Sequence, residues 1–383
     1  MMGRAIAYDL ARAKGVEEVV LGDISLEVAR RSAAWAGQEG PGAGKAPKGG
    51  LAAIRPVKAD VSKIASIKKF MKGMDAAVGA VSYRFNVALS KAAIAMKVNF
   101  NDLGGNNTVV QNQLALDEKA RKAGITIVPD CGLAPGMVAL LVARAVEKLG
   151  TADSVWIRVG GLPLHPVPPL NYKIVFQPDG LINEYVEPAV ALRDGKKVEL
   201  ECLTDIEELE FPPPFGKLEA FVTSGGASTL PDTFKNRVRD LDYKTIRYPG
   251  HAERFKAILS LGLGSTKPLK VGGLRLAPRA LLNYLLLVAP DLNREDQDSV
   301  LVRVTAVKGE KKVQYELIDL GEPALGITAM MRTTSFPAST VAWMLGSGKV
   351  EKKGAFPQEL CIPAESFIRE IRKRGVDVKL QRL

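Results

Sequence analysis

The first 25 residues constrain the fold of this chain more than any other stretch. In MMGRAIAYDLARAKGVEEVVLGDIS, Gly3 opens a helical pattern that breaks at Gly15, and a short β-branched run then ends at Asp23. This order matches the second half of a dinucleotide-binding βαβ unit, in which a strand and a G-x-G-x-x-G turn precede the helix. The stretch therefore predicts an α/β Rossmann domain whose first strand is apparently missing.

The apparently missing strand would occupy the centre of the predicted sheet. That strand is buried on both faces between two neighbours, so its loss would leave backbone donors and acceptors unpaired. We therefore expect that the true start lies upstream of Met1. Roughly ten upstream residues would encode a β-branched strand ending in Gly-x-Gly.

Up to about residue 130, strand-like and helix-like apolar runs alternate. Strand-like runs occur in VEEVVLGD, LAAIRPVKAD, DAAVGAVS, KVNFNDLGG and ITIVPDCG, with helical spacing between them. Such alternation predicts a parallel sheet with helices on both faces. The stretch from Gly37 to Gly50 is rich in Gly, Pro and Lys, so we expect a surface excursion there.

Beyond about residue 150, strand-like runs follow one another directly. They are SVWIRVGG, NYKIVFQ, KKVELECL, KLEAFVT, SVLVRVTAVKG and KKVQYELIDL. This succession predicts an α+β region with a mainly antiparallel or mixed sheet and a few helices, including HAERFKAILSLG. Helical spacing returns in SFPASTVAWMLGSG and PAESFIREIRKRG.

Composition narrows the class of protein. The formal net charge is +11, but Lys and Arg are interleaved with acidic residues and form no basic tail, so we expect no nucleic-acid partner. Three cysteines without C-x-x-C spacing and two histidines argue against a disulfide framework and against a metal site. No apolar run or signal-peptide core suggests a membrane partner or secretion, so a cytoplasmic location is expected.

Several residues at strand ends are candidate cofactor contacts. A carboxylate at Asp23 can accept a hydrogen bond from a ribose 2′-hydroxyl and repels a 2′-phosphate, which predicts NAD as the cofactor; an ordinary helix N-cap is the alternative. Gly3 would be the third glycine of the fingerprint. Asp60 ends the next strand and is either an adenine-edge contact or a solvated loop acid. Ser82 and Asn86 follow the strand after that.

The string VPDCGLAPGMVALL places a glycine turn between a strand and a helix. Asp130 ends the strand, and Pro135 and Gly136 are expected in the first turn of the helix, where backbone N–H groups are available. We expect Asp130 to form a polar wall of the active site. A thiolate mechanism at Cys131 has no identifiable histidine partner.

The string RYPGH supplies a cation, a phenol and an imidazole within five residues. Arg247 is a candidate carboxylate clamp, with a surface ion pair as the alternative. His251 is a candidate base or water-positioning residue with a pKa near neutral, with a helix-start residue as the alternative. Tyr248 is a substrate-contact candidate for which packing is the stronger interpretation.

Five separated strings resemble the saccharopine dehydrogenase-like family, and within it most resemble the lysine 6-dehydrogenase branch. They are DCGLAPG, GGLP followed by PPLNYKIVF, GLINEYVEPA, LEAFVTSGGASTLPDTF and TIRYPGHAERFKAIL. The resemblance implies a nicotinamide dinucleotide on a Rossmann domain, expected at 1–129 and 332–383. It also implies an inserted substrate-binding and dimerisation domain, expected at 130–331, and hence a homodimer or higher homo-oligomer.

The lysine branch converts the ε-amino group of L-lysine to an aldehyde, 2-aminoadipate 6-semialdehyde, with release of ammonia. In that reaction Asn183 and Glu184 of GLINEYVEP would orient the substrate amine. A saccharopine- or carboxynorspermidine-type dehydrogenase is an alternative, and its additional carboxylate calls for a second arginine beside Arg247. A non-catalytic dimeric binding protein with a degraded cofactor site is another.

Overall fold

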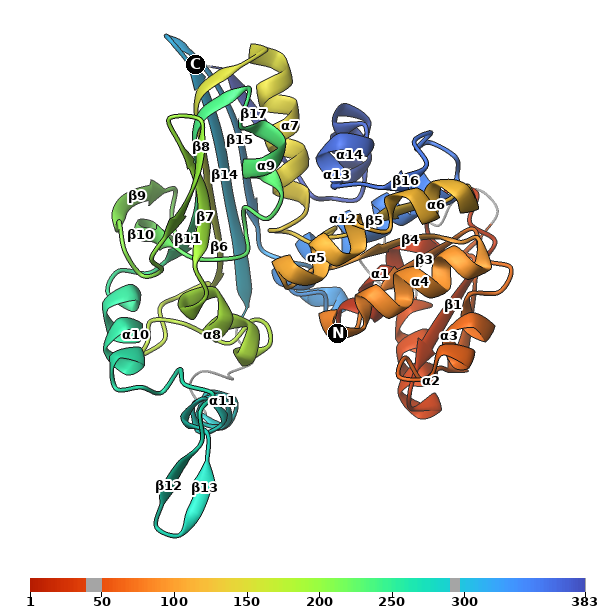
Figure 1. Ribbon diagram of the computed structural model, residues 1–383, viewed down its shortest axis with the longest axis horizontal. Helices are drawn as coiled ribbons and strands as arrows, with labels where there is room; N and C mark the ends of the chain where they lie inside the picture. Colours follow the sequence, from red (N-terminus) through yellow and green to blue (C-terminus); the bar gives the residue numbers. More distant parts are fainter. Residues whose placement is uncertain (39–49, 290–296, 383) are drawn as a thin grey trace. The chain divides into compact units, whose positions relative to one another are not determined.

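The computed structural model describes residues 1–38, 50–289 and 297–382 (Figure 1). The predicted excursion between Gly37 and Gly50 therefore lies almost wholly outside the described residues. The chain divides into two compact units. The first contains residues 1–144, 322–327 and 331–378, and the second contains 145–321, 328–330 and 379–383.

This division differs from the predicted one in two places. It falls after Arg144, inside a helix, and not after residue 129. The chain end is also shared, because the strand β17 (Lys379–Arg382) pairs with β15 (Lys311–Asp319) of the second unit. The last helical pattern in the sequence ends before β17, and nothing in the sequence indicated that these final residues pair with β15.

The first unit alternates short strands with helices, as predicted. Its elements are α1 (Met2–Ala11), β1 (Glu18–Asp23), α2 (Leu26–Ala36), β2 (Ala53–Lys58), α3 (Ile64–Met71), β3 (Ala76–Gly79), the 3-10 turn η1 (Tyr83–Phe85), α4 (Asn86–Met96), β4 (Asn99–Asp102), α5 (Asn107–Leu114), α6 (Asp117–Ala123), β5 (Thr126–Val128), most of α7 (Met137–Leu149), most of α12 (Ala329–Gly346), β16 (Gly354–Ala355), α13 (Gln358–Cys361) and α14 (Ala364–Lys373).

The parallel strands of the first unit form two separate sheets. One contains β1 and β2, and the other has the order β16-β5-β4-β3. In a doubly wound sheet, the position between β1 and β3 belongs to the strand that precedes the first helix. Within the described residues, β1 therefore pairs only with β2, and β3 only with β4.

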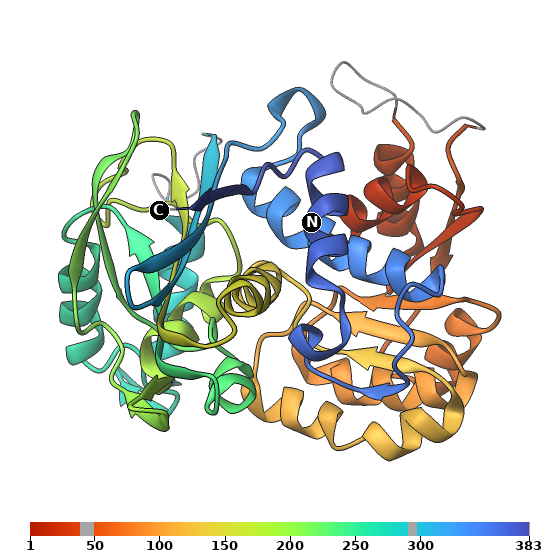
Figure 2. The same ribbon diagram turned by 90° about the horizontal axis from the view of Figure 1, so that it is seen from above.

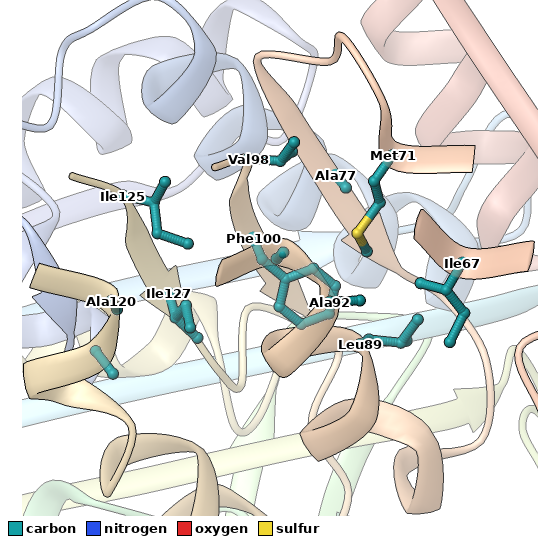
Figure 3. Packing of buried hydrophobic residues seen from close by; sticks show 12 residues of the cluster. Ile67, Met71, Ala77, Leu89, Ala92, Val98, Phe100, Ala120, Ile125 and Ile127 are labelled. Atoms are coloured by element: carbon teal, nitrogen blue, oxygen red, sulfur yellow. The ribbon is translucent and has the colours of Figure 1, made fainter. Parts of the chain in front are cut away.

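Helices cover both faces of the four-stranded sheet. Figure 3 shows Phe100 of β4 packed with Leu89 and Ala92 of α4 and with Met71 of α3. The next residue, Asn101, points to the opposite face and donates from Nδ2 to the carbonyl of Ala338 in α12, at 3.0 Å. The predicted two-faced cover is therefore present.

The last helices of the first unit pack against its first helix (Figure 2). Asp9 of α1 is buried, and its Oδ2 accepts hydrogen bonds from Ser339 Oγ of α12 at 2.6 Å and from Arg374 Nε, just after α14, at 2.9 Å. The bonds to Asp9 join α1, α12 and the residue after α14, and breaking one of them would leave a buried charge without its partner. These contacts explain why the C-terminal helices belong to the first unit.

The second unit is built on one nine-stranded mixed sheet with the order β17-β15-β14-β6-β11-β10-β9. In addition, β7 pairs with β11, and β8 pairs with β7. Only β6 and β11 pair in parallel along this path; the other pairs are antiparallel. Its other elements are β6 (Ala152–Pro163), α8 (Pro178–Val186), β7 (Ala189–Arg193), β8 (Lys196–Leu200), β9 (Glu207–Phe211), β10 (Gly216–Val222), α9 (Leu230–Phe234), β11 (Val238–Arg247), α10 (His251–Ser260), β12 (Leu269–Val271), β13 (Leu274–Leu276), α11 (Pro278–Val288) and β14 (Asp298–Lys308).

One predicted strand of the second unit is wrong. NYKIVFQ, residues 171–177, forms no strand and runs as an irregular connection into α8. Its alternating apolar residues are not set by a sheet; Tyr172 and Val175 are buried within the unit. Among the described helices of both units, none is long and apolar enough to cross a bilayer.

Candidate functional site

Five side chains gather on one face of the large sheet. Arg247 ends β11, Glu184 and Tyr185 lie on α8, His251 begins α10, and Tyr172 comes from the irregular connection before α8. We call these residues the arginine cluster. Direct ring contacts join Tyr172 and Tyr185 to His251, with centroids 5.1 and 5.9 Å apart.

Arg247 is the buried cation of the cluster, with 2% of its surface exposed. Its Nη1 donates to the Ile246 carbonyl at 2.9 Å, and its guanidinium lies over the Tyr172 ring at 4.7 Å. Within the described residues its Nε has no hydrogen-bond acceptor. Desolvation acts to lower the pKa of Arg247, but the neighbouring Tyr185, Tyr172 and Glu184 outweigh it and raise the pKa, so the charge is retained. A buried guanidinium with a free donor is suited to an incoming carboxylate.

Glu184 is the acidic member of the cluster. Desolvation raises the pKa of Glu184 to about 7, and the attraction of Arg247 lowers it only in part. Its carboxyl is therefore divided between its neutral and ionised forms near neutral pH. A ligand ammonium beside it would favour the ionised form.

His251 does not have the predicted near-neutral pKa. Burial is the main reason that the pKa of His251 falls to about 3, and the charge of Arg247 adds to the effect. Its Nδ1 lies 2.8 Å from the carbonyl of Leu170, so Nδ1 carries the proton. Nε2 then accepts from the Tyr185 hydroxyl at 3.0 Å. In this structure His251 is a neutral hydrogen-bond acceptor, which does not fit the predicted base titrating near pH 7.

Glu219 of β10 fixes the start of α10 beneath His251. Its two carboxylate oxygens accept from the backbone N–H groups of Gly250 and Ala252, each at 2.8 Å. Gly250 has a φ of 85°, a conformation that favours glycine. Glu219 pairs directly with Arg247 across the β10–β11 ladder. Glu219 was not predicted as a site residue, because the strand register that places it opposite Arg247 cannot be read from the sequence.

Two predicted substrate contacts lie away from the arginine cluster. Tyr248 packs with Phe211 and Leu218 in a core on the other face of the sheet, and its hydroxyl donates to the Leu164 carbonyl at 2.8 Å. Asn183 accepts from Arg279 of α11 through its Oδ1, which turns its side chain toward α11. The structure thus brings Arg247, Glu184 and His251 together, but not Tyr248 or Asn183.

Tyr172 and Tyr185 were not among the residues that the sequence predicted for the site. Tyr172 was assigned to a strand, where its neighbours would alternate between two faces. Tyr185 directly follows the predicted Glu184, and a helix points adjacent side chains about 100° apart. The packing of Tyr185 against Phe221 and Phe255 shows that its side chain points into the interior of the second unit.

In the first unit, polar side chains gather where β4 and β5 end. Asp102 is buried and accepts from Gln113 Nε2 at 2.6 Å, from the Gly104 N–H at 2.8 Å and from the Asp130 N–H at 3.4 Å. Desolvation raises the pKa of Asp102 to about 6. The carbonyl of Asp130 accepts from Gln358 Nε2 at 2.6 Å. Carboxyl ends of parallel strands are where α/β sheets bind ligands.

The turn after Asp130 differs from its prediction. α7 begins at Met137, so Pro135 and Gly136 precede the helix and the expected first-turn N–H groups are not at these residues. Gly136 has a φ of 147°, and a Cβ there would lie 1.9 Å from the Gly132 carbonyl oxygen. Only glycine fits this close approach. Cys131 is buried, and desolvation raises its pKa well above the ordinary value, which leaves the thiolate disfavoured.

The cofactor candidates occupy separate positions in the first unit. Asp23 ends β1, and its Oδ1 accepts from the Ser25 N–H at 2.9 Å, while Ser25 and not Asp23 caps α2. Asp60 accepts from both the N–H and the hydroxyl of Ser62, at 3.0 and 2.6 Å, and therefore behaves as a turn acid. A Cβ at Gly3 would meet Ala80 at 3.6 Å, an ordinary contact.

Two features fit a dinucleotide at this edge of the first unit. Asn86 is buried at the start of α4, and within the described residues its Oδ1 has no donor. The first turn of α1 has neither a side-chain cap nor an acidic residue, so its N–H groups remain available to an anion. Ser82 is exposed and does not cap η1 with its side chain. Asp23 and Asn86 could therefore hold ribose hydroxyls or a carboxamide.

The chain was compared with known proteins. The model of the saccharopine dehydrogenase NADP binding domain matches residues 1–128, and that of the saccharopine dehydrogenase C-terminal domain matches residues 132–376. Mouse (Mus musculus) mitochondrial alpha-aminoadipic semialdehyde synthase is 25% identical over 221 residues, 55% of this chain and 23% of the relative.

A second relative, the saccharopine dehydrogenase [NADP(+), L-glutamate-forming] of Saccharomyces cerevisiae, is 25% identical over 225 residues, 55% of this chain and 48% of its own length. The chain therefore spans between a quarter and a half of these relatives. The solved apo structure of saccharopine dehydrogenase (L-Glu forming) from Saccharomyces cerevisiae superposes with a TM-score of 0.76 at 17% identity, covering 100% of this chain and 98% of that one. With its two family models covering almost all of its residues, the chain belongs to the saccharopine dehydrogenase family.

Proposed function

We propose that this chain is a dehydrogenase of amino acids that uses a nicotinamide dinucleotide, and that its substrate is L-lysine, deaminated at the ε-carbon. The observation that carries the proposal is the pairing of a buried guanidinium with a carboxyl of raised pKa. Arg247 would bind the α-carboxylate, and Glu184, with a pKa of about 7, would bind the α-ammonium. Together they complement the zwitterionic end of an amino acid.

The other cluster members orient this pair. Tyr185 donates to His251 Nε2, and its hydroxyl lies near enough to Arg247 to influence the pKa of the guanidinium. Tyr172 covers the guanidinium face. The nicotinamide ring, when bound, supplies the hydride acceptor. Binding at the α-carbon end leaves the amine-bearing side chain of the substrate outside the ion pairs, as ε-oxidation requires.

We further propose NAD as the preferred cofactor. A carboxylate at Asp23 facing a 2′-phosphate would repel it, which favours NAD over NADP. The matching domain family and the yeast relative are both named for NADP, and the carboxylate of Asp23 is the reason for proposing NAD for this chain instead. Asp23→Ser should narrow the difference in affinity between the two cofactors.

A saccharopine-type reaction is the second candidate, favoured by the names of the relatives. Its substrate carries an additional carboxylate and would need another cation. Among the described residues, Arg158 is the one other buried arginine, and it lies on the opposite sheet face beside Glu207 and Asp242. The second unit by itself therefore fits one amino-acid carboxylate better than two.

Steady-state assays test these proposals directly. The purified chain is incubated with L-lysine or saccharopine and with NAD⁺ or NADP⁺, and reduced cofactor is followed by its absorbance. Arg247→Ala should raise the KM for lysine at least 100-fold with a smaller fall in kcat, because a carboxylate clamp binds ground and transition states alike. Arg254→Ala, an exposed arginine on α10, is the matched control.

Calorimetric titration with lysine provides a readout without turnover. We expect binding by wild type and by Arg254→Ala, and a loss with Arg247→Ala. Turnover of saccharopine but not lysine would replace the first candidate with the second. Binding of lysine that survives Arg247→Ala would remove the arginine cluster from substrate recognition altogether.

A further inference from the structure

Helix α11 contacts α8, the helix that carries Glu184 of the arginine cluster (Figure 1). Two of its polar residues, Arg279 and Asn283, are one turn apart and therefore share a face of α11. They bind two residues of α8, Asp179 and Asn183, that are also one turn apart. The two helices thus face each other through matched polar positions, although Asp179 and Arg279 lie 100 positions apart in the sequence.

Arg279 makes most of this contact. Its Nε donates to Asp179 Oδ1 and its Nη2 to the Asp179 carbonyl, both at 2.9 Å. The same Nη2 donates to Asn183 Oδ1. Asn283 Nδ2 adds a hydrogen bond to Asp179 Oδ1 at 3.0 Å. One guanidinium, with a side chain that is 11% exposed, therefore joins three acceptors on α8.

The contribution of this contact is geometric more than electrostatic. Asp179 is 58% exposed, so its attraction to the Arg279 charge is weakened by water. Desolvation acts to raise the pKa of Asp179, but the hydrogen bonds from Asn283 and Arg279 outweigh it and lower the pKa. The carboxylate therefore stays ionised at neutral pH, and the contact keeps its acceptors in fixed positions.

A second anchor holds the same part of α8 from the large sheet. Ser224, two residues after β10, donates from its N–H to the Glu184 carbonyl at 2.9 Å and from its Oγ to the Asn183 carbonyl at 3.2 Å. Asn183 is thus bound through its main chain by Ser224 and through its side chain by Arg279. The residue directly before Glu184 is fixed by two different elements.

The position of α8 determines how much water reaches Glu184. The residue is only half-buried, yet desolvation raises the pKa of its carboxyl to about 7. Desolvation depends on burial, so a carboxyl near the edge of the protein interior responds to small movements of its helix. Loosening α8 from α11 would admit water and stabilise the ionised form.

The groups that surround Glu184 do not titrate near neutral pH. Arg247 of β11 stays protonated, and His251 of α10 stays neutral above its pKa of about 3. Burial raises the pKa of the remaining neighbours, to about 12 for Tyr172 and Cys202, and it also raises the pKa of Tyr185 and Tyr243. Among the described groups that interact with one another here, Glu184 is therefore the one that changes charge near pH 7.

We propose that Arg279 is a positioning residue for the arginine cluster: by holding α8 against α11, it sets how far the Glu184 carboxyl is removed from water. Arg279 acts through the helix and not through the substrate. Its effect on lysine binding rests on the function proposed above, whereas its effect on the Glu184 carboxyl does not.

Nuclear magnetic resonance of the full chain, labelled with ¹³C at the glutamate side-chain carboxyls, measures the titration of Glu184. Its signal is assigned by its absence from Glu184→Gln. Arg279→Ala should lower the pKa of Glu184 by at least one unit relative to wild type, and Arg279→Lys should restore part of the difference, because an ammonium cannot reach all three acceptors. Arg275→Ala, an exposed arginine on β13, is the matched control and should leave the pKa unchanged.

Calorimetric titration with lysine at pH 6 and pH 8 gives the second readout. A pKa of about 7 predicts that wild type binds about tenfold more tightly at pH 8, because more of the Glu184 carboxyl is ionised there. In Arg279→Ala this ratio should fall to about twofold or less. Asn183→Ala removes the same hydrogen bond from the side of α8 and should act in the same direction, and the double variant should add little.

The two readouts separate the possible failures. An unchanged Glu184 pKa in Arg279→Ala, with lysine still bound, overturns the role of Arg279 and leaves the proposed substrate standing. A lowered pKa in a chain whose wild type binds no lysine supports the role of Arg279 and contradicts the proposed substrate. A lower melting temperature without any change in the pKa would assign Arg279 to helix packing alone and overturn the proposal. Asn183→Ala carries the same test should Arg279→Ala fail to fold.

Discussion

The sheets of the two units differ in continuity, and the difference is visible in how deeply their strands are buried. In the second unit β6 is flanked by β14 and β11, and eight of its last nine residues are buried. In the first unit β1 has one buried residue of six and β2 has none. Parallel strands are normally covered on both faces and paired on both edges. Strand pairing, more than local sequence, therefore determines how far each strand is removed from water.

The comparison also separates a sheet face whose charged side chains pair with one another from strands with an open edge. On the face opposite Arg247, Asp242 accepts from Arg158 at 2.6 Å and from Arg193 at 2.8 Å. Lys244 donates to Glu207 at 3.0 Å in the same network. β1 and β3, by contrast, each have a backbone edge without a strand partner within the described residues.

The largest expected effect is a loss of stability in the nine-stranded sheet of the second unit. Asp242→Asn should lower the free energy of unfolding of the second unit by about 3–5 kcal/mol, because it leaves buried Arg158 without full compensation. Urea unfolding followed by circular dichroism measures it. Asp240→Asn is the control on the same strand: its partner Arg239 is 61% exposed, and a loss of less than about 1 kcal/mol is expected. Equal losses would show that the network is not coupled to the sheet.

The next prediction concerns the open edges of β1 and β3 in the two sheets of the first unit. A strand of Val-rich sequence ending in Gly-Ala-Gly, fused ahead of Met1, should pair with β1 and β3 and join the two sheets of the first unit. We expect the melting temperature to rise by several degrees, corresponding to about 1–2 kcal/mol. NADH should also bind more tightly, measured by its fluorescence, since added backbone N–H groups can approach the pyrophosphate. A scrambled extension of equal length is the control; no gain over it would mean that the edges do not accept a strand.

A smaller effect concerns the residues that position Arg247. Tyr185→Phe and His251→Ala should each raise the KM for lysine about tenfold and leave the pH profile of kcat unchanged, because His251 already remains neutral above its pKa of about 3. The double variant should lose little more than either single one, since both remove the same hydrogen bond. Loss of an ionisation near pH 7 from the kcat profile of His251→Ala would restore its role as a base.

The last prediction concerns the dependence of lysine affinity on pH. With a pKa of about 7, Glu184 is ionised above that value, so calorimetric affinity for lysine should rise up to tenfold per pH unit below pH 7 and level off above it. Glu184→Gln should flatten this dependence. A wild-type affinity that is constant from pH 5.5 to 7 would show that the Glu184 carboxyl does not meet the substrate ammonium.

The alternation of strands and helices was enough to predict both sheet classes. Of the predicted substrate-site residues, the structure brings Arg247, Glu184 and His251 together but places Tyr248 and Asn183 elsewhere. The chemistry of His251 could not be predicted, because its pKa depends on the Leu170 carbonyl and on Tyr185, which other segments supply. Asp102 was missed for a similar reason: Gln113 and Asp130 become its partners only when neighbouring strands align. Short-range patterns identify elements, whereas burial and long-range pairing set the protonation of their side chains.

The ion pair between Asp9 and Arg374 has a consequence for synthesis on the ribosome. These residues are 365 positions apart, so α1 leaves the ribosome long before its partner is made. Residues 145–321, which supply nearly all of the second unit, are complete well before that point. Domains commonly fold as they emerge, and contacts between distant residues form late. The first unit therefore finishes folding after the second, because its first helix stays without its buried ion-pair partner until the last helices have been made.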